Sequence, residues 1–178
     1  YKGLSLTAWG SVGLSDPDDT KELDLTLAYK VGGLNIGVTD YWFNAPNDRY
    51  FCYAAHETSH VFEANIGYDF GSVAVQWYTN FAGNDGFNKS GKRAYSSYVE
   101  ASAPFRLAGC QWTAAVGAVP YATSFYADAG GFAVTNVSLR AAKDIHVTKS
   151  FTLPLFAAVS ANPSTEKAYM VFGFTLRP

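Results

Sequence analysis

Hydrophobic and polar residues alternate along most of this chain, and that alternation restricts the fold more than any other feature. Between Lys21 and Val31, apolar residues on one face oppose polar residues on the other: Leu23, Leu25, Leu27 and Tyr29 against Glu22, Asp24 and Thr26. Successive side chains of a β-strand point to opposite faces, so a period of two predicts a strand with one apolar face. The pattern recurs about ten times, about 18 residues apart, which predicts an all-β, antiparallel, up-and-down sheet.

The connections between these strands alternate in length. Short turns are expected near Lys2-Gly3, Gly32-Gly33, Gly71-Ser72, Pro104 to Gly109 and Asp144 to Lys149. Longer, more polar connections are expected at Leu14 to Thr20, Asn44 to Ser59, Ala82 to Lys92 and Pro120 to Gly131, with a shorter one at Asn162 to Glu166. Short turns at one rim and long loops at the other are typical of a transmembrane β-barrel. We find no linker, so residues 1–178 are expected to form one domain.

Composition narrows the class of protein further. The net charge is -2, which argues against a nucleic-acid binder, and two cysteines cannot form a disulfide scaffold. No stretch of about 18 consecutive apolar residues is present, so no transmembrane helix is expected. Charged residues make up 16% of the chain and aromatic residues another 16%, which leaves a soluble β-domain or a transmembrane barrel.

The polar face of the strands favours the membrane barrel. A soluble barrel needs many charges on its exterior, but the middle parts of these strands carry only a few: Glu22, Asp24, Glu63, Glu100 and Arg140. We expect all five to face the interior. Aromatic residues near strand ends fit the two membrane–water interfaces, namely Tyr41, Trp42 and Phe43 at one rim and Tyr68 and Phe70 at the other.

Five stretches of the chain resemble the TorF-type porin family of Gram-negative outer membranes. They are KGLSLTAWGS, KELDLTLAYKVGGLNIGVTDYWF, VFEANIGYDFGSVAVQWYTNFAG, YSSYVEASAPF and YMVFGFTL. The resemblance lies in strand rhythm and small motifs. It implies an outer-membrane β-barrel with a loosely defined transport role, and it supplies no functional residues.

Two departures from that family concern the ends of the chain. The opening Tyr1-Lys2-Gly3 has the character of a hairpin turn, so we expect preceding strands and about twelve in the intact barrel. The ending Arg177-Pro178 lacks the terminal aromatic residue that is common in outer-membrane barrels.

The sequence His56-Glu57-Thr58-Ser59-His60 matches the H-E-x-x-H pattern of zinc proteases. That pattern needs a helix, in which the two histidines lie about 6 Å apart along the axis. Here it leads directly into an alternating strand, where the same spacing is about 13 Å. We therefore expect a polar loop entering a strand, with no metal and no other cofactor. No catalytic residues are identified, and we expect the protein not to be an enzyme.

The leading functional expectation is a narrow porin-like channel for small solutes or ions in the cell outer membrane. The expected pore-lining residues are Glu22, Asp24, Glu63, Asn65, Gln76, Glu100 and Arg140, and their charges predict a mild preference for cations. The first alternative is a closed barrel that acts as an accessory subunit of a larger outer-membrane complex. A soluble, ligand-binding barrel is a more distant alternative. The expected partners are membrane lipid and, for the accessory subunit, other outer-membrane proteins, but no nucleic acid.

Overall fold

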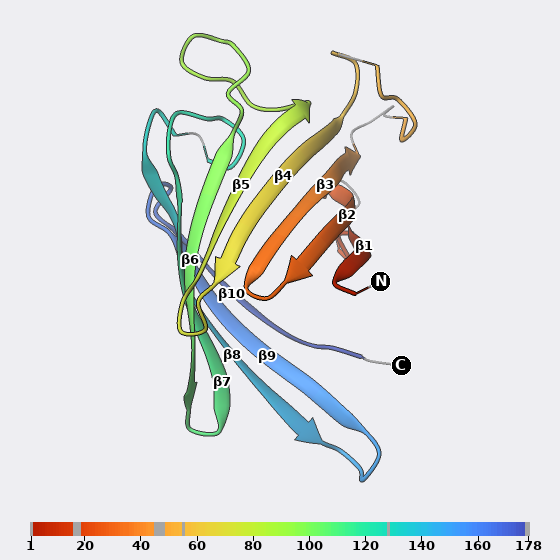
Figure 1. Ribbon diagram of the computed structural model, residues 1–178, viewed down its shortest axis with the longest axis vertical. Helices are drawn as coiled ribbons and strands as arrows, with labels where there is room; N and C mark the ends of the chain where they lie inside the picture. Colours follow the sequence, from red (N-terminus) through yellow and green to blue (C-terminus); the bar gives the residue numbers. More distant parts are fainter. Residues whose placement is uncertain (1, 16–18, 45–48, 55, 128, 177–178) are drawn as a thin grey trace.

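Ten antiparallel strands form a single sheet whose order follows the chain, with each strand paired to the next (Figure 1). The computed structural model describes residues 2–15, 19–44, 49–54, 56–127 and 129–176. The strands are β1 (Leu4–Ser11), β2 (Lys21–Val31), β3 (Leu34–Asn44), β4 (His60–Asp69), β5 (Ala74–Gly83), β6 (Ser97–Leu107), β7 (Cys110–Val119), β8 (Ala133–His146), β9 (Thr152–Asn162) and β10 (Lys167–Phe174). The all-β, up-and-down architecture predicted from the alternation is confirmed. No helix in the described residues is long and apolar enough to cross a membrane.

The sheet is strongly curled. β3 to β5 lie in front in Figure 1, and β8 to β10 pass behind and below them. Within the part of the chain that the structure describes, β1 pairs only with β2 and β10 only with β9, so the two edges do not meet. The sheet is therefore open, and a closed barrel stays a prediction.

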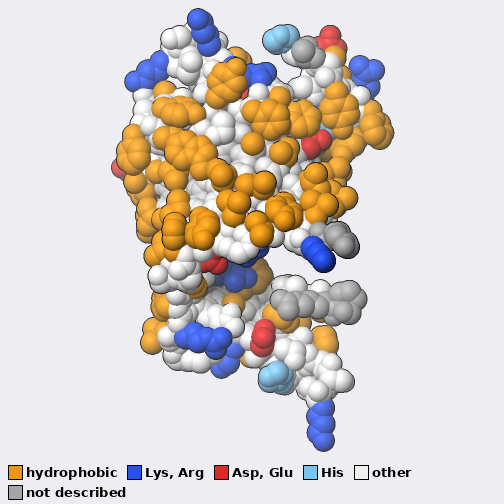
Figure 2. Space-filling view, viewed as in Figure 1, with side chains coloured by type: hydrophobic (Ala, Val, Ile, Leu, Met, Phe, Trp, Pro, Cys, Tyr) orange, Lys and Arg blue, Asp and Glu red, His pale blue; other side chains and the backbone are white. Residues whose placement is uncertain are grey.

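The two faces of the sheet differ in chemistry, as the alternation predicts. We call the face that carries Thr26, Thr39 and Glu63 the inner face, because Tyr126 of the β7–β8 connection reaches across it to Glu63. The opposite, outer face carries large apolar side chains that remain exposed, such as Leu6 at 76% and Phe172 at 84%. Figure 2 shows hydrophobic side chains gathered over β3 to β5, with lysine and arginine mostly at the loops.

Buried residues gather at the end of the sheet that carries the long connections, which we call the loop end. Val61 and Val119 are buried there, together with the polar residues Asn80, Ser96 and Thr123. The β5–β6 and β7–β8 connections pack on each other, since the Thr123 hydroxyl donates to Ser96 Oγ at 2.6 Å and the backbone NH of Phe87 donates to Ser124 Oγ at 3.0 Å. This packing gives the loop end a defined shape.

Two short turns begin later than the sequence indicates. The strand β6 continues through Pro104 to Leu107, and only Ala108 and Gly109 form the turn, both with positive φ. Pro104 is tolerated because it lies beyond Ser102, the last residue of β6 that pairs with β5. The strand β8 likewise extends past Asp144 to His146.

The remaining expected turns and chain ends are in part outside the described residues. Lys2 and Gly3 form a turn before β1, as expected, but Tyr1 lies outside the described residues, as do Arg177 and Pro178. Cys52 and Cys110 are both free. Cys52 belongs to a long connection and Cys110 follows a short turn, so they lie at opposite ends of the sheet.

Candidate functional site: tyrosines around two carboxylates

Four tyrosines and two glutamates meet on the inner face at the loop end. Tyr41, Glu63, Tyr78, Tyr98 and Tyr126, with Thr135 and Asn136, line a cavity of about 440 Å³. A cavity of this size is in the roughly 300–1,000 Å³ range of small-molecule sites. Glu100 lies beside it, hydrogen bonded to two of the lining residues.

Glu63 is the most buried acidic group of this site, with only 2% of its surface exposed. The hydroxyl of Tyr41 donates to Glu63 Oε1 at 2.9 Å, and the hydroxyl of Tyr126 donates to Oε2. Both oxygens of this carboxyl group therefore have a tyrosine hydroxyl as hydrogen-bond partner. Tyr126 also contacts Asn80 Oδ1 at 3.3 Å, so one loop residue reaches both β4 and β5.

Glu100 has a similar arrangement on the next strands. Tyr98 donates its hydroxyl to Glu100 Oε2 at 2.8 Å, and Asn136 Nδ2 donates to the same oxygen at 3.3 Å. Ser160 donates to Asn136 Oδ1 at 2.7 Å, which extends the network to β9. The side chains that bind each carboxylate are therefore neutral donors.

A glycine makes room for the Tyr98 ring. Gly117 pairs with Glu100 across β6 and β7, and a Cβ atom placed there would lie 1.8 Å from the Tyr98 hydroxyl oxygen. Tyr98 thus leans over β7, with its ring 6.0 Å from that of Tyr78 and 5.8 Å from that of Tyr126. The three tilted rings form one aromatic wall of the cavity.

Two β-bulges lie beside this site. Phe81 is an extra residue of β5 next to the Glu63–Asn80 pair, and Thr135 is an extra residue of β8 next to the Gly117–Asn136 pair. Bulges bend a strand and redirect its side chains. Both bulges lie near the loop end, where the β5–β6 and β7–β8 connections pack on each other.

The connection that carries Tyr126 is held by aromatic contacts. Phe125 packs edge-to-face on Phe43 of β3, with ring centroids 6.3 Å apart. Burial, together with the negative charge of Glu63, raises the pKa of the Tyr126 hydroxyl well above its ordinary value. Tyr126 therefore stays a neutral hydrogen-bond donor at physiological pH.

The seven expected pore-lining residues share the inner face, but they do not form one cluster. Glu63 and Glu100 lie at the tyrosine site, and Gln76 pairs with Glu100 and donates to Asn65 Oδ1 at 3.1 Å. Asp24 pairs with Tyr41, and Glu22 lies two residues earlier on the same face of β2. Arg140 lies nearer the short-turn end, with its guanidinium carbon 4.5 Å from the centre of the Phe156 ring. That these residues line a pore stays a prediction.

Several residues of the inner face are not predicted by the sequence. Tyr41 and Phe43 are expected at the membrane–water interface, but they face the interior, and of the three rim aromatics of β3 only Trp42 lies on the outer face. Tyr126 carries no local signal, because its role depends on the docking of a long loop. Arg106 is expected in a turn, but it belongs to β6 and shares an inner-face cavity with Arg140.

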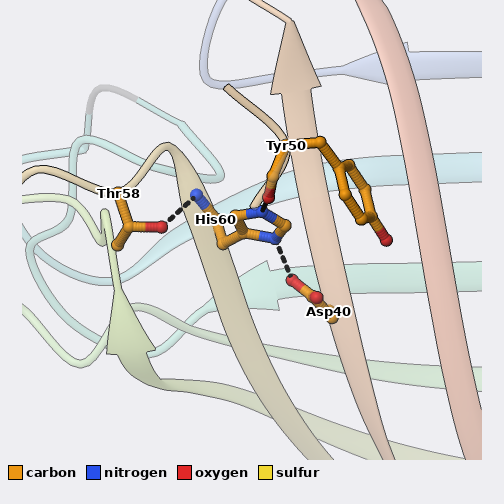
Figure 3. Close-up of polar contacts among 4 residues, drawn as sticks. All are labelled: Asp40, Tyr50, Thr58 and His60. Atoms are coloured by element: carbon orange, nitrogen blue, oxygen red, sulfur yellow. Dashed lines mark hydrogen bonds and ion pairs between the residues drawn. The ribbon is translucent and has the colours of Figure 1, made fainter. Parts of the chain in front are cut away.

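His60, the last residue of the H-E-x-x-H pattern, belongs to a cluster of hydrogen bonds on the outer face. His60 begins β4 and is fully buried, and its ring nitrogens lie 2.6 Å from Asp40 Oδ1 and 2.6 Å from the Tyr50 carbonyl oxygen (Figure 3). Its backbone NH donates to Thr58 Oγ1 at 3.1 Å. Each ring nitrogen therefore has an oxygen partner within hydrogen-bond distance. Because both nitrogens are engaged, neither is available to hold a metal ion.

His56 lies apart from this pair, in a turn at a positive φ of 67°. The described residues of this connection form no helix, and no group of three metal-binding side chains occurs in the described part of the chain. The pattern thus leads from a loop into a strand, as predicted. Asp40 is an outer-face charge that the alternation alone does not single out.

No family model, no curated protein and no solved structure matches this chain.

Proposed function

We propose that this protein is an outer-membrane β-barrel that forms a narrow, porin-like channel for small solutes or ions. Solutes would pass along the inner face, and the tyrosine site would be the narrowest part of the passage. Closure of the sheet is part of this proposal, because a bilayer does not tolerate the unpaired backbone groups of an open edge.

The exposed apolar outer face carries this proposal. Ile36, Val38, Ile66 and Val75 lie on the outer face of the neighbouring strands β3 to β5 and are each about 40–55% exposed. Soluble monomers rarely expose contiguous apolar patches larger than a few hundred Å². A belt of this kind, opposite a polar face, suits a surface in contact with lipid.

The inner face supports a passage for polar solutes that is restricted by a loop. Hydrogen bonds join Thr26 to Thr39, Gln76 to Asn65 and Asn136 to Glu100 across it. The β7–β8 connection crosses this face, and the hydroxyl of Tyr126 in this connection donates a hydrogen bond to Glu63. A barrel of about ten to twelve strands is narrow, and a loop inside it would limit the passage to small molecules.

A closed barrel that serves as an accessory subunit is the second candidate. The same hydrogen bonds and the inward loop favour it, since both reduce the open space inside. A soluble ligand-binding barrel would leave the apolar outer face in water.

A liposome-swelling assay separates these candidates. The full chain is reconstituted from detergent, and swelling is recorded in isotonic glycine, glucose and a trisaccharide. The proposal predicts swelling that falls steeply from glycine to the trisaccharide. No swelling from membrane-inserted protein would favour the accessory subunit, and solubility without detergent would favour the soluble barrel.

A further inference from the structure

We propose that the tyrosine site binds small organic ammonium ions, with the positive charge held among the rings of Tyr41, Tyr78, Tyr98 and Tyr126. This inference rests on the proposed function in one respect, that the inner face is the face that solutes reach. It goes further by assigning a ligand class to that face.

The carboxylates of the site have no cationic partner among the described residues. The ion pair between Asp40 and His60 lies on the outer face, away from the cavity. None of the residues that line the cavity is basic, and the side chains on Glu63 and Glu100 are neutral. A carboxylate in a poorly solvated position attracts a positive charge strongly.

Asp24 pairs with Tyr41 across β2 and β3 and places a further oxygen acceptor beside the site. Its Oδ1 atom is buried and has no hydrogen-bond partner among the described residues. The two arginines of the inner face do not offset these acids locally. Arg140 packs on Phe156, and Arg106 shares its cavity near the short-turn end.

The tyrosine hydroxyls leave the rings available to the ligand. Three of the four hydroxyls donate to a carboxylate, from Tyr41 and Tyr126 to Glu63 and from Tyr98 to Glu100. Because these hydroxyls already donate to carboxylates, a ligand in the cavity would contact the faces of the rings. A phenol that donates to a carboxylate also gains electron density, which strengthens the attraction of its ring for a cation.

Ring geometry and size favour an organic cation over a metal ion. The rings of Tyr78, Tyr98 and Tyr126 follow each other at 6.0 and 5.8 Å with tilts of 38° and 34°, so they form a curved wall. Aromatic walls of this kind recognise quaternary ammonium groups. A cavity of about 440 Å³ is far larger than a bare metal ion requires.

Isothermal titration of the purified full chain in a non-ionic detergent tests the proposal, with choline as the probe. Its uncharged analogue 3,3-dimethyl-1-butanol has the same shape and serves as the matched ligand. We expect choline to bind at least about tenfold more tightly than this alcohol, and K⁺ at equal ionic strength to compete only weakly. Equal affinity for the two ligands, absence of choline binding, or displacement by K⁺ at choline's own concentration would overturn the proposal.

Three variants locate the binding. Y98L should lower choline affinity at least about fivefold, while Y98F keeps the ring and should stay within about threefold of wild type. Y29L, on the outer face, should leave affinity unchanged, and circular dichroism confirms that each variant is folded. Unchanged affinity in folded Y98L would overturn the assignment. Choline binding without liposome swelling would refute only the channel, and swelling without choline binding would refute only this site.

Discussion

At the scale of single residues, the contact between Tyr126 and Glu63 has the largest structural consequence. It joins a loop to a strand 63 residues earlier in the chain and covers a carboxylate that is almost fully buried. The sequence predicts the inward orientation of Glu63 from its neighbours Phe62 and Ala64. It does not predict the donor, because no pattern in residues 120–131 indicates where that loop docks.

The variant Y126F should destabilise the protein by about 1.5–3 kcal/mol, the usual contribution of a hydrogen bond to a charged group. Denaturant unfolding in detergent measures this difference, and Y29F, which changes a partly exposed tyrosine on the outer face, should stay within about 0.5 kcal/mol of wild type. The raised pKa of Tyr126 favours its neutral form, so its stabilisation is complete at neutral pH and is lost only as the pH rises above about 10. Equal stability of Y126F and Y29F would show that the contact is unimportant.

The Asp40–His60 pair should hold residues 49–54 against the outer face, because His60 Nε2 contacts the Tyr50 carbonyl and Tyr53 packs 4.4 Å from the imidazole. Replacing Asp40 with Asn leaves His60 buried without its charged partner, a change that costs on the order of 3 kcal/mol. Trypsin should then cleave after Arg49 several-fold faster than in wild type. D144N, which alters an exposed aspartate near the short-turn end, provides the control. Equal cleavage rates in D40N and D144N would contradict this role.

At the scale of strands and turns, the alternation predicts which face each side chain occupies, but not where the strands end. The alternation depends only on adjacent residues in the sequence, and all ten strands show it. The point where β6 ends depends instead on its pairing with the neighbouring strands β5 and β7. Proline is common in turns, so Pro104 indicates a turn. The sequence does not reveal that β6 stops pairing with β5 at Ser102, which is what allows Pro104 to lie in the strand. The predicted turn before Gly109 therefore begins too early.

Ala108 has a positive φ of 52° in this two-residue turn, a conformation that favours glycine. A108G should therefore stabilise the protein by about 0.5–1 kcal/mol. The matched change A101G, within β6 and on its outer face, should destabilise it by a similar amount. Denaturant unfolding of both variants measures the difference, and destabilisation by A108G would contradict the turn geometry.

The face assignment of individual strands can be tested with the natural tryptophans. Trp77 of β5 shares the outer face with Val75, whereas Trp9 of β1 pairs with Asp24 on the inner face. In liposomes with bromine on the lipid acyl chains, a protein that retains only Trp77 should lose most of its fluorescence. One that retains only Trp9 should lose little. Equal quenching of the two would contradict the proposal that only the outer face meets lipid.

At the scale of the whole molecule, four acidic residues of the inner face lie apart from Arg106 and Arg140. Glu22, Asp24, Glu63 and Glu100 lie in the half nearer the long connections, while Arg106 and Arg140 lie nearer the short turns. The sequence predicts an acidic interior but misses Arg106. It also predicts a closed barrel, which depends on pairing between the two edge strands and not on any local pattern.

The reversal potential of the protein in a planar bilayer under a KCl gradient tests the central proposal most directly. We expect discrete conductance steps and a reversal potential that favours K⁺ over Cl⁻, because Glu63 and Glu100, at the tyrosine site, have no cationic partner among the described residues. The double variant E63Q/E100Q should move the reversal potential toward zero, and E57Q, in an exposed turn, should not. Membrane-inserted protein without conductance, or with a reversal potential that favours Cl⁻, would contradict the proposed channel.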